Sequence, residues 1–135
     1  YLEMMEAARP EALNTSSDAI TTAAYYVAQD VDARLIVNYT MSGSTALRTA
    51  RQRPEVPILC LTPDLKAARR LMLSYGVHTV HDEKGVEDFT GPARHAADIG
   101  VTKGFLEKGD RFIMTAGVPF GVSGSTNILR IGKVE

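Results

Sequence analysis

The chain has 135 residues, 44% of them hydrophobic and 23% charged, and its formal net charge is −1. This length is sufficient for one soluble domain with its own core. A near-neutral chain lacks the basic stripe that a nucleic-acid or membrane-surface partner needs. The apolar runs are also much shorter than the roughly 20 residues of a membrane-spanning helix. We therefore expect neither nucleic acid nor membrane as a partner.

Cysteine content and the first residue bear on where the protein works. The single cysteine, Cys60, cannot form an internal disulfide, which favours a reducing, cytoplasmic compartment. The chain starts at Tyr1, and no signal-peptide pattern follows. We interpret it as an excised or processed piece of a longer protein.

Helical and strand-like patterns alternate through the first part of the chain. The strand-like runs are apolar without alternation, as in strands buried on both faces. This alternation predicts a parallel sheet with helices on its faces and right-handed crossovers. Helices are predicted over residues 1–12, 14–32, 42–53 and 64–76, and strands over residues 34–40, 57–62 and 77–82.

Individual residues refine two of these helices. Ser16, Ser17 or Asp18 could supply the N-cap of the helix over residues 14–32. In the helix over residues 42–53, Leu47 and Ala50 are expected to face inward. We expect the arginines Arg48, Arg51 and Arg53 to face largely outward.

The last part of the chain changes character. Residues 86–106 look helical, with Pro92 either kinking the helix or lying near a fresh start. Two more strands are predicted within residues 108–117 and 126–134. The loop between them, Gly117–Ser125, has no room for a crossover helix, so these two strands must run antiparallel. The fold class is therefore α/β, with a mixed sheet of about five strands.

The segment after the first predicted strand combines hydroxyls and a glycine at a helix start. The first amides of a helix have no intrahelical partner and carry the positive end of its dipole. Gly43 would let the backbone approach a ligand at the sheet edge where open α/β folds usually bind one. These features indicate a phosphate site, and the simpler alternative is that Ser42 only caps the helix. The candidate phosphate-binding residues are Thr40, Met41, Ser42, Gly43, Ser44 and Thr45.

The same four letters, SGST, return at Ser123–Thr126 between the two final strands. No helix dipole assists a loop in this position. The loop is richer in glycine than a tight hairpin requires, so it could fold over a ligand held by the first loop. The alternative is a long hairpin connection without a ligand. The candidate loop residues are Gly117, Pro119, Gly121, Ser123 and Gly124.

Other chemistry-bearing residues give weaker signals. His78 and His81 are three apart on a strand, so they point to opposite faces and make a poor metal pair. His95 is expected to be solvated on a polar helix, and Cys60 to be a buried small hydrophobe. No lysine follows Gly43 at the spacing of the nucleotide-binding P-loop. We find no catalytic triad, carboxylate pair or metal cluster, which favours binding without chemistry.

The order of motifs resembles the C-terminal domain of pyruvate kinase in its bacterial form. The resemblance includes "TMSGSTA", the prolines and threonine of "RPEVPILCLT", "GV" before the third strand, "KGD", and "TAGVPFGVSGSTN". It covers nearly the whole chain, and five motifs in order at matching spacing are specific.

The resemblance implies a three-layer α/β/α sandwich whose last strand is antiparallel. It also implies a regulatory role, because the family's phosphoryl transfer from phosphoenolpyruvate to ADP, with Mg²⁺ and K⁺, takes place in a separate barrel. No residues here resemble that barrel, so residues 1–14 would be a connecting helix and the chain alone would have no catalytic residues and no cofactor. In effector-responsive members, the T-x-S-G-x-[ST] loop grips a phosphate and the glycine-rich loop closes over the effector. The domain also packs against its mate in a homotetramer.

Departures from the family pattern bear on the effector. Relatives that respond to fructose bisphosphate use a tryptophan and an arginine for the second phosphate. This chain has no tryptophan, and Pro92 lies about where that arginine would be. A sugar monophosphate or AMP therefore fits better than fructose bisphosphate. Loss of regulation, a domain that serves assembly only, and a sugar isomerase-type phosphosugar domain are the alternatives.

Overall fold

The computed structural model describes residues 16–41, 43–71, 76–82, 91–117 and 126–135. The predicted helix over residues 1–12 lies outside this part of the chain. Helices are α2 (Ser16–Asp30), α3 (Ser44–Arg51), α4 (Leu65–Leu71) and α5 (Gly91–Thr102). Strands are β1 (Leu35–Tyr39), β2 (Ile58–Thr62), β3 (Val77–His81), β4 (Arg111–Gly117) and β5 (Thr126–Lys133).

The strands form one mixed sheet in the order β3-β2-β1-β4-β5. β1 pairs in parallel with both β2 and β4, and β2 pairs in parallel with β3. β4 and β5 are antiparallel. The predicted five-stranded sheet with an antiparallel last strand is confirmed.

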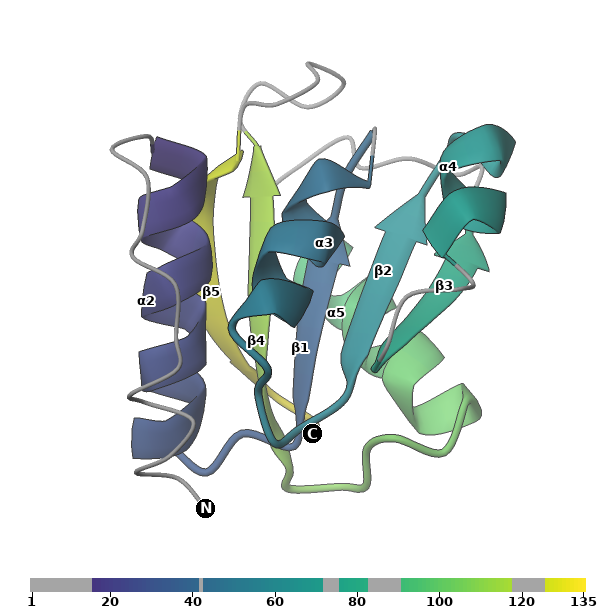
Figure 1. The fold of residues 1–135 in the computed structure, drawn as a ribbon. Helices are drawn as coiled ribbons and strands as arrows, with labels where there is room; N and C mark the ends of the chain where they lie inside the picture. The colour runs from purple at the N-terminus through teal and green to yellow at the C-terminus, as the bar shows by residue number, and fades with distance from the viewer. Residues whose placement is uncertain (1–15, 42, 72–75, 83–90, 118–125) are drawn as a thin grey trace.

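Helices cover both faces of this sheet, as Figure 1 shows: α2, α3 and α4 lie on one face and α5 lies on the other. Apolar clusters fill both spaces between the layers. On one face Ala93 and Ala96 of α5 join Phe112 and Met114 of β4. On the other face Ala24 of α2 contributes to a cluster with residues of β1 and β4. The fold is therefore the three-layer sandwich that the sequence predicted.

The central strands carry the densest burial. Every residue of β1 and β2 is buried, as expected for strands covered on both faces. Cys60 on β2 has no exposed surface, and burial raises its thiol pKa to about 12. The prediction that Cys60 is a buried hydrophobe is confirmed. Among the described helices, none is both long and apolar enough to cross a membrane.

One helix face differs from the sequence prediction. Leu47, expected to face inward, is 42% exposed. The buried residues of α3 are Thr45, Ala46 and Thr49. Short side chains let α3 lie close to its neighbours, and both threonine hydroxyls have hydrogen-bond partners there. Because those hydroxyls have hydrogen-bond partners, burying them costs little free energy. The threonine face of α3 therefore packs inward, and the prediction that Leu47 faces inward was wrong.

Pro92 lies in the first turn of α5. A proline is tolerated there because the first amides of a helix have no intrahelical acceptor. Of the two expectations for Pro92, the structure therefore favours a position near a helix start. Residues 86–90 of the predicted helix lie outside the described part of the chain.

Candidate functional site at the carboxyl ends of β1 and β4

The first predicted loop follows β1 at the point where the sheet changes its winding direction. The chain leaves β1 through α3 on one face to reach β2. It returns from β3 through α5 on the other face to reach β4, on the far side of β1 (Figure 1). Open α/β sheets bind ligands at such a switch point, outside the carboxyl ends of the strands. The topology thus brings Thr40 and Met41 to the edge where a ligand site is expected.

Gly43 shapes the start of α3. It is the N-cap residue, with a left-handed φ of 83°, and as a glycine it has no side chain that could cap the helix. Its amide donates a hydrogen bond to Thr40 Oγ1 at 3.0 Å. A Cβ at this position would lie 2.8 Å from Leu71 Cδ1, so glycine suits both the conformation and the space. The structure thus assigns the N-cap position to Gly43, and Ser42, the cap expected in the simpler alternative, lies outside the described residues.

The electrostatics of this helix start favour an anion. The first-turn amides of α3, which begins at Ser44, have no intrahelical acceptors and carry positive partial charge. The first turn holds no acidic side chain that would compete for them. The basic residues Arg48 and Arg51 lie in the last turn. A phosphate beside the first turn would meet no carboxylate from this helix.

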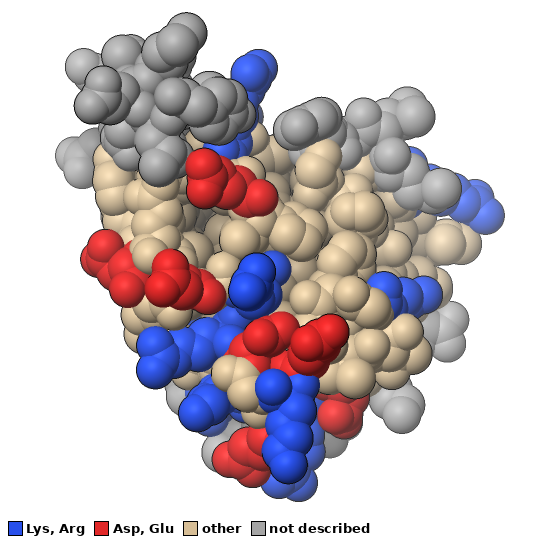
Figure 2. Space-filling view, turned by 90° about the horizontal axis from the view of Figure 1, so that it is seen from below, with Lys and Arg blue, Asp and Glu red and all other residues tan. Residues whose placement is uncertain are grey.

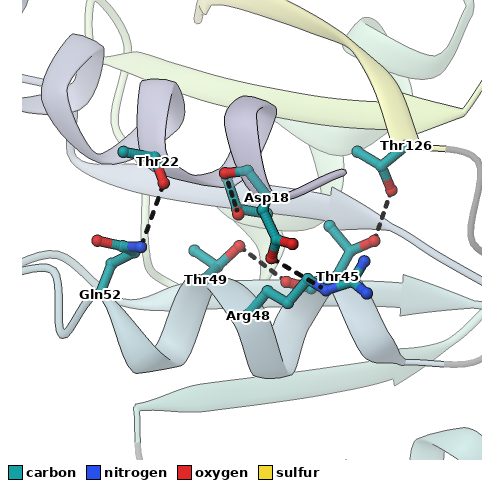
Figure 3. Close-up of polar contacts among 8 residues, drawn as sticks. Asp18, Thr22, Thr45, Arg48, Thr49, Gln52 and Thr126 are labelled. Atoms are coloured by element: carbon teal, nitrogen blue, oxygen red, sulfur yellow. Dashed lines mark hydrogen bonds and ion pairs between the residues drawn. The ribbon is translucent and has the colours of Figure 1, made fainter. Parts of the chain in front are cut away.

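Thr45 connects the two SGST segments. Its side chain is 2% exposed, and its hydroxyl lies 2.5 Å from the hydroxyl of Thr126 (Figure 3). Thr45 ends the first SGST and Thr126 ends the second, so the last residues of the two echoed motifs bond to each other. The structure therefore brings the start of α3 against the start of β5. Thr126 was not among the predicted site residues, although the repeated motif was a signal for it.

The remaining predicted residues are placed as follows. Ser44 is the first residue of α3 and is half-buried. Gly117 is the last residue of β4. Pro119, Gly121, Ser123 and Gly124 lie outside the described part of the chain.

A polar seam joins α2 to α3 beside this edge (Figure 3). Asp18 in the first turn of α2 forms an ion pair with Arg48 at 3.4 Å. Gln52 donates a hydrogen bond to the hydroxyl of Thr22 at 3.3 Å. Arg48 was expected to face outward, but its side chain is only 27% exposed and is directed to α2. This seam holds α3 against α2 by polar contacts.

A second polar group lies under α5. His95 Nε2 is 2.8 Å from Asp82 Oδ2, and the Tyr39 hydroxyl donates to the carbonyl of Pro92 at 3.1 Å. The expectation that His95 is solvated was only partly correct: its side chain is 31% exposed, and its ring contacts Asp82, which directly follows β3. Burial, and then the charge of Asp82, raise the pKa of Tyr39. Within the described residues no three potential metal ligands gather.

Replacing Tyr39 by phenylalanine should make stability less sensitive to alkaline pH. Folded Tyr39 keeps its proton to higher pH than the unfolded chain, whose tyrosine titrates near pH 10. Stability is therefore lost as pH rises above about 10, at about 1.4 kcal/mol per pH unit. Tyr39→Phe removes that slope but costs about 1 kcal/mol at pH 7, because a hydrogen bond is lost.

Urea unfolding at pH 7, 10 and 11 measures this effect. Tyr26→Phe makes the same chemical change at a residue that is 43% exposed and serves as the matched control. An equal alkaline slope in wild type and Tyr39→Phe would contradict the assignment.

The opposite end of the sheet, at the amino ends of the parallel strands, carries charges of both signs. Seen from below in Figure 2, it carries Lys and Arg side chains interspersed with Asp and Glu. A cleft of about 740 Å³ at this end is lined by Tyr25, Gln29, Arg34 and Glu55, among others. Its mixed charge does not favour an anion, and this visible face offers no continuous basic surface to a nucleic acid.

The fold, and the geometry at the carboxyl ends of β1 and β4, define an α/β domain with a polar candidate ligand site at a topological switch point. The family model described as "Pyruvate kinase, alpha/beta domain" matches residues 18–132. The chain belongs to this family.

Several bacterial pyruvate kinases are similar to the chain. The enzyme of Methylorubrum extorquens is 43% identical over 134 residues, which cover 99% of this chain and 28% of that protein. The enzyme of Clostridium acetobutylicum is 38% identical over 121 residues, covering 89% of this chain and 25% of that protein. The enzyme of Geobacillus stearothermophilus is 34% identical, covering 93% and 21%. The chain thus spans about a quarter of the length of these relatives.

Proposed function

We propose that the chain is the effector-binding and oligomerisation domain of a cytoplasmic pyruvate kinase, the glycolytic enzyme that transfers phosphate from phosphoenolpyruvate to ADP. Family membership and full-chain similarity to pyruvate kinases support this proposal. The transfer itself, with Mg²⁺ and K⁺, would take place in a catalytic barrel outside these residues. The domain would respond to a phosphorylated metabolite and contribute to a homotetramer.

One observation carries the binding part of the proposal. The N-terminus of α3, opened by Gly43, lies at the switch point of the sheet and directly beside Thr126. Positive helix ends with exposed amides bind phosphate readily. The hydroxyl of Thr45 is occupied by Thr126, so the first-turn amides would be the main ligands for the phosphate, assisted by the neighbouring hydroxyls of the loop.

The surroundings of Pro92 favour an effector with one phosphate group over one with two. Pro92 lies about where the family resemblance places the arginine for a second phosphate, and it is buried in the first turn of α5. Its carbonyl accepts the hydrogen bond from Tyr39. This position therefore supplies no cation, and we propose a sugar monophosphate or AMP as the effector in preference to fructose bisphosphate.

Calorimetric titration of the full chain tests the proposal. We expect saturable binding of glucose 6-phosphate or AMP, and weaker or no binding of fructose 1,6-bisphosphate. The double variant Ser42→Ala, Thr45→Ala removes two hydroxyls of the loop but no amide, so it should weaken this binding and retain its assembly state in light scattering. If the double variant loses its assembly state together with binding, the two residues serve the structure of the domain. If the unaltered chain binds no phosphorylated compound, only a role in assembly remains for the domain. The sugar isomerase-type alternative receives no support from the family assignment.

A further inference from the structure

A chain of buried hydrogen bonds crosses the sheet beneath the first turn of α3. Thr115 donates its hydroxyl to Asn38 Oδ1 at 2.6 Å. Asn38 donates its Nδ2–H to Thr49 Oγ1 at 3.1 Å, and Thr49 donates to the carbonyl of Thr45 at 2.9 Å. The Thr45 hydroxyl then meets that of Thr126. Side chains from β4, β1 and α3 thus form one path that ends on the backbone carbonyl of Thr45, and the side chain of the same residue contacts β5.

The path is fully enclosed. Asn38, Thr49 and Thr115 have no exposed surface, and Thr45 and Thr126 are at most 4% exposed. Hydrogen bonds in such low-dielectric surroundings strengthen one another, and three successive donors here point from β4 toward α3. Apolar residues of similar size could fill the same volume without desolvating polar groups. What the hydrogen bonds add is a fixed relative position of the joined elements.

We propose that Asn38, Thr49 and Thr115 are positioning residues for the phosphate site at the start of α3. The inference rests on the proposed function. These three residues touch no ligand, but they fix the carbonyl of Thr45 and with it the first turn of α3. Since anion binding at a helix end requires several amides to converge on one point, a small displacement of this turn weakens all of those contacts together.

Paired variants of Thr49 test the inference in the full chain. Thr49→Val keeps the volume but removes the hydroxyl that accepts from Asn38 and donates to Thr45, whereas Thr49→Ser keeps that hydroxyl. Thr115→Val interrupts the path at its other end. We expect the two valine variants to bind glucose 6-phosphate or AMP about fivefold to tenfold more weakly than wild type, the effect of about one lost hydrogen bond. Thr49→Ser should stay within about twofold of wild type.

Thr79 on β3 offers a matched control for a lost buried hydroxyl. Its Oγ1 is buried and has no hydrogen-bond partner in the part of the chain that the structure describes. Thr79→Val should leave the Kd unchanged, because it makes the same chemical change outside the path. All Kd values are measured well below the unfolding midpoint of each variant, so that a stability loss alone does not move them.

The outcomes separate this inference from the proposed function. Weaker binding by Thr49→Val and Thr115→Val, with normal binding by Thr49→Ser and Thr79→Val, supports the positioning role. Wild-type affinity in both path variants, or an equal loss in Thr79→Val, overturns the inference and leaves the proposed function standing. Failure of the wild-type chain to bind any phosphorylated probe overturns both.

Discussion

Replacing Ser44 by aspartate should weaken phosphate binding at least 100-fold while making the folded chain more stable. Ser44 is the first residue of α3, so the carboxylate that the substitution introduces would lie beside the proposed phosphate. Two like charges about 4 Å apart repel by about 4 kcal/mol at an effective dielectric constant of about 20, and salt screens part of this energy. A negative charge in the first turn also stabilises a helix, by about 0.3–1 kcal/mol.

The opposite signs of these two effects make the experiment informative. Calorimetric titration with glucose 6-phosphate or AMP measures affinity, and urea unfolding measures stability. Ser44→Asn has nearly the same shape without the charge and should bind within about tenfold of wild type. Unchanged affinity in Ser44→Asp would falsify the placement of an anion at the start of α3. A loss of both affinity and stability would indicate local misfolding instead.

The fold could be predicted because its determinants are local in the sequence. The apolar run over residues 34–40 became β1 (Leu35–Tyr39), and the run over residues 57–62 became β2 (Ile58–Thr62). Alternating helices and strands leave few arrangements, because crossovers between parallel strands are right-handed. The short interval between β4 and β5 then required an antiparallel pair.

The details of the site depend on packing, which the sequence pattern does not contain. Helical periodicity ranks Leu47 above Thr45 as a core residue, but Thr45 is buried because Thr126 satisfies its hydroxyl. Thr126 lies 81 positions from Thr45 in the sequence. His95 was expected in solvent for a similar reason, since its partner Asp82 lies 13 positions away, just after β3. Polar contacts between distant elements appear only once the chain is folded.

Replacing Gly132 by alanine should destabilise the domain by about 2 kcal/mol, a typical cost of overpacking a core. Gly132 on β5 lies opposite Phe112 on β4. A Cβ at this position would clash with Cζ of the Phe112 ring and would lie 2.6 Å from its Cε1. The ring is 1% exposed and belongs to the core beneath α5, so it cannot move aside into solvent. A glycine in a strand interior here marks a close approach of a ring to the backbone.

A double-mutant cycle separates this steric effect from the general effect of glycine on the unfolded chain. Phe112→Leu shortens the side chain that the new methyl group would meet. If the clash is the cause, the double variant should lose at least about 1 kcal/mol less stability than the sum of the two single variants. Additive losses in urea unfolding would instead assign the effect to the backbone. β5 also carries Thr126, so a displacement of β5 in Gly132→Ala should weaken phosphate binding. Adding Phe112→Leu should restore part of that affinity.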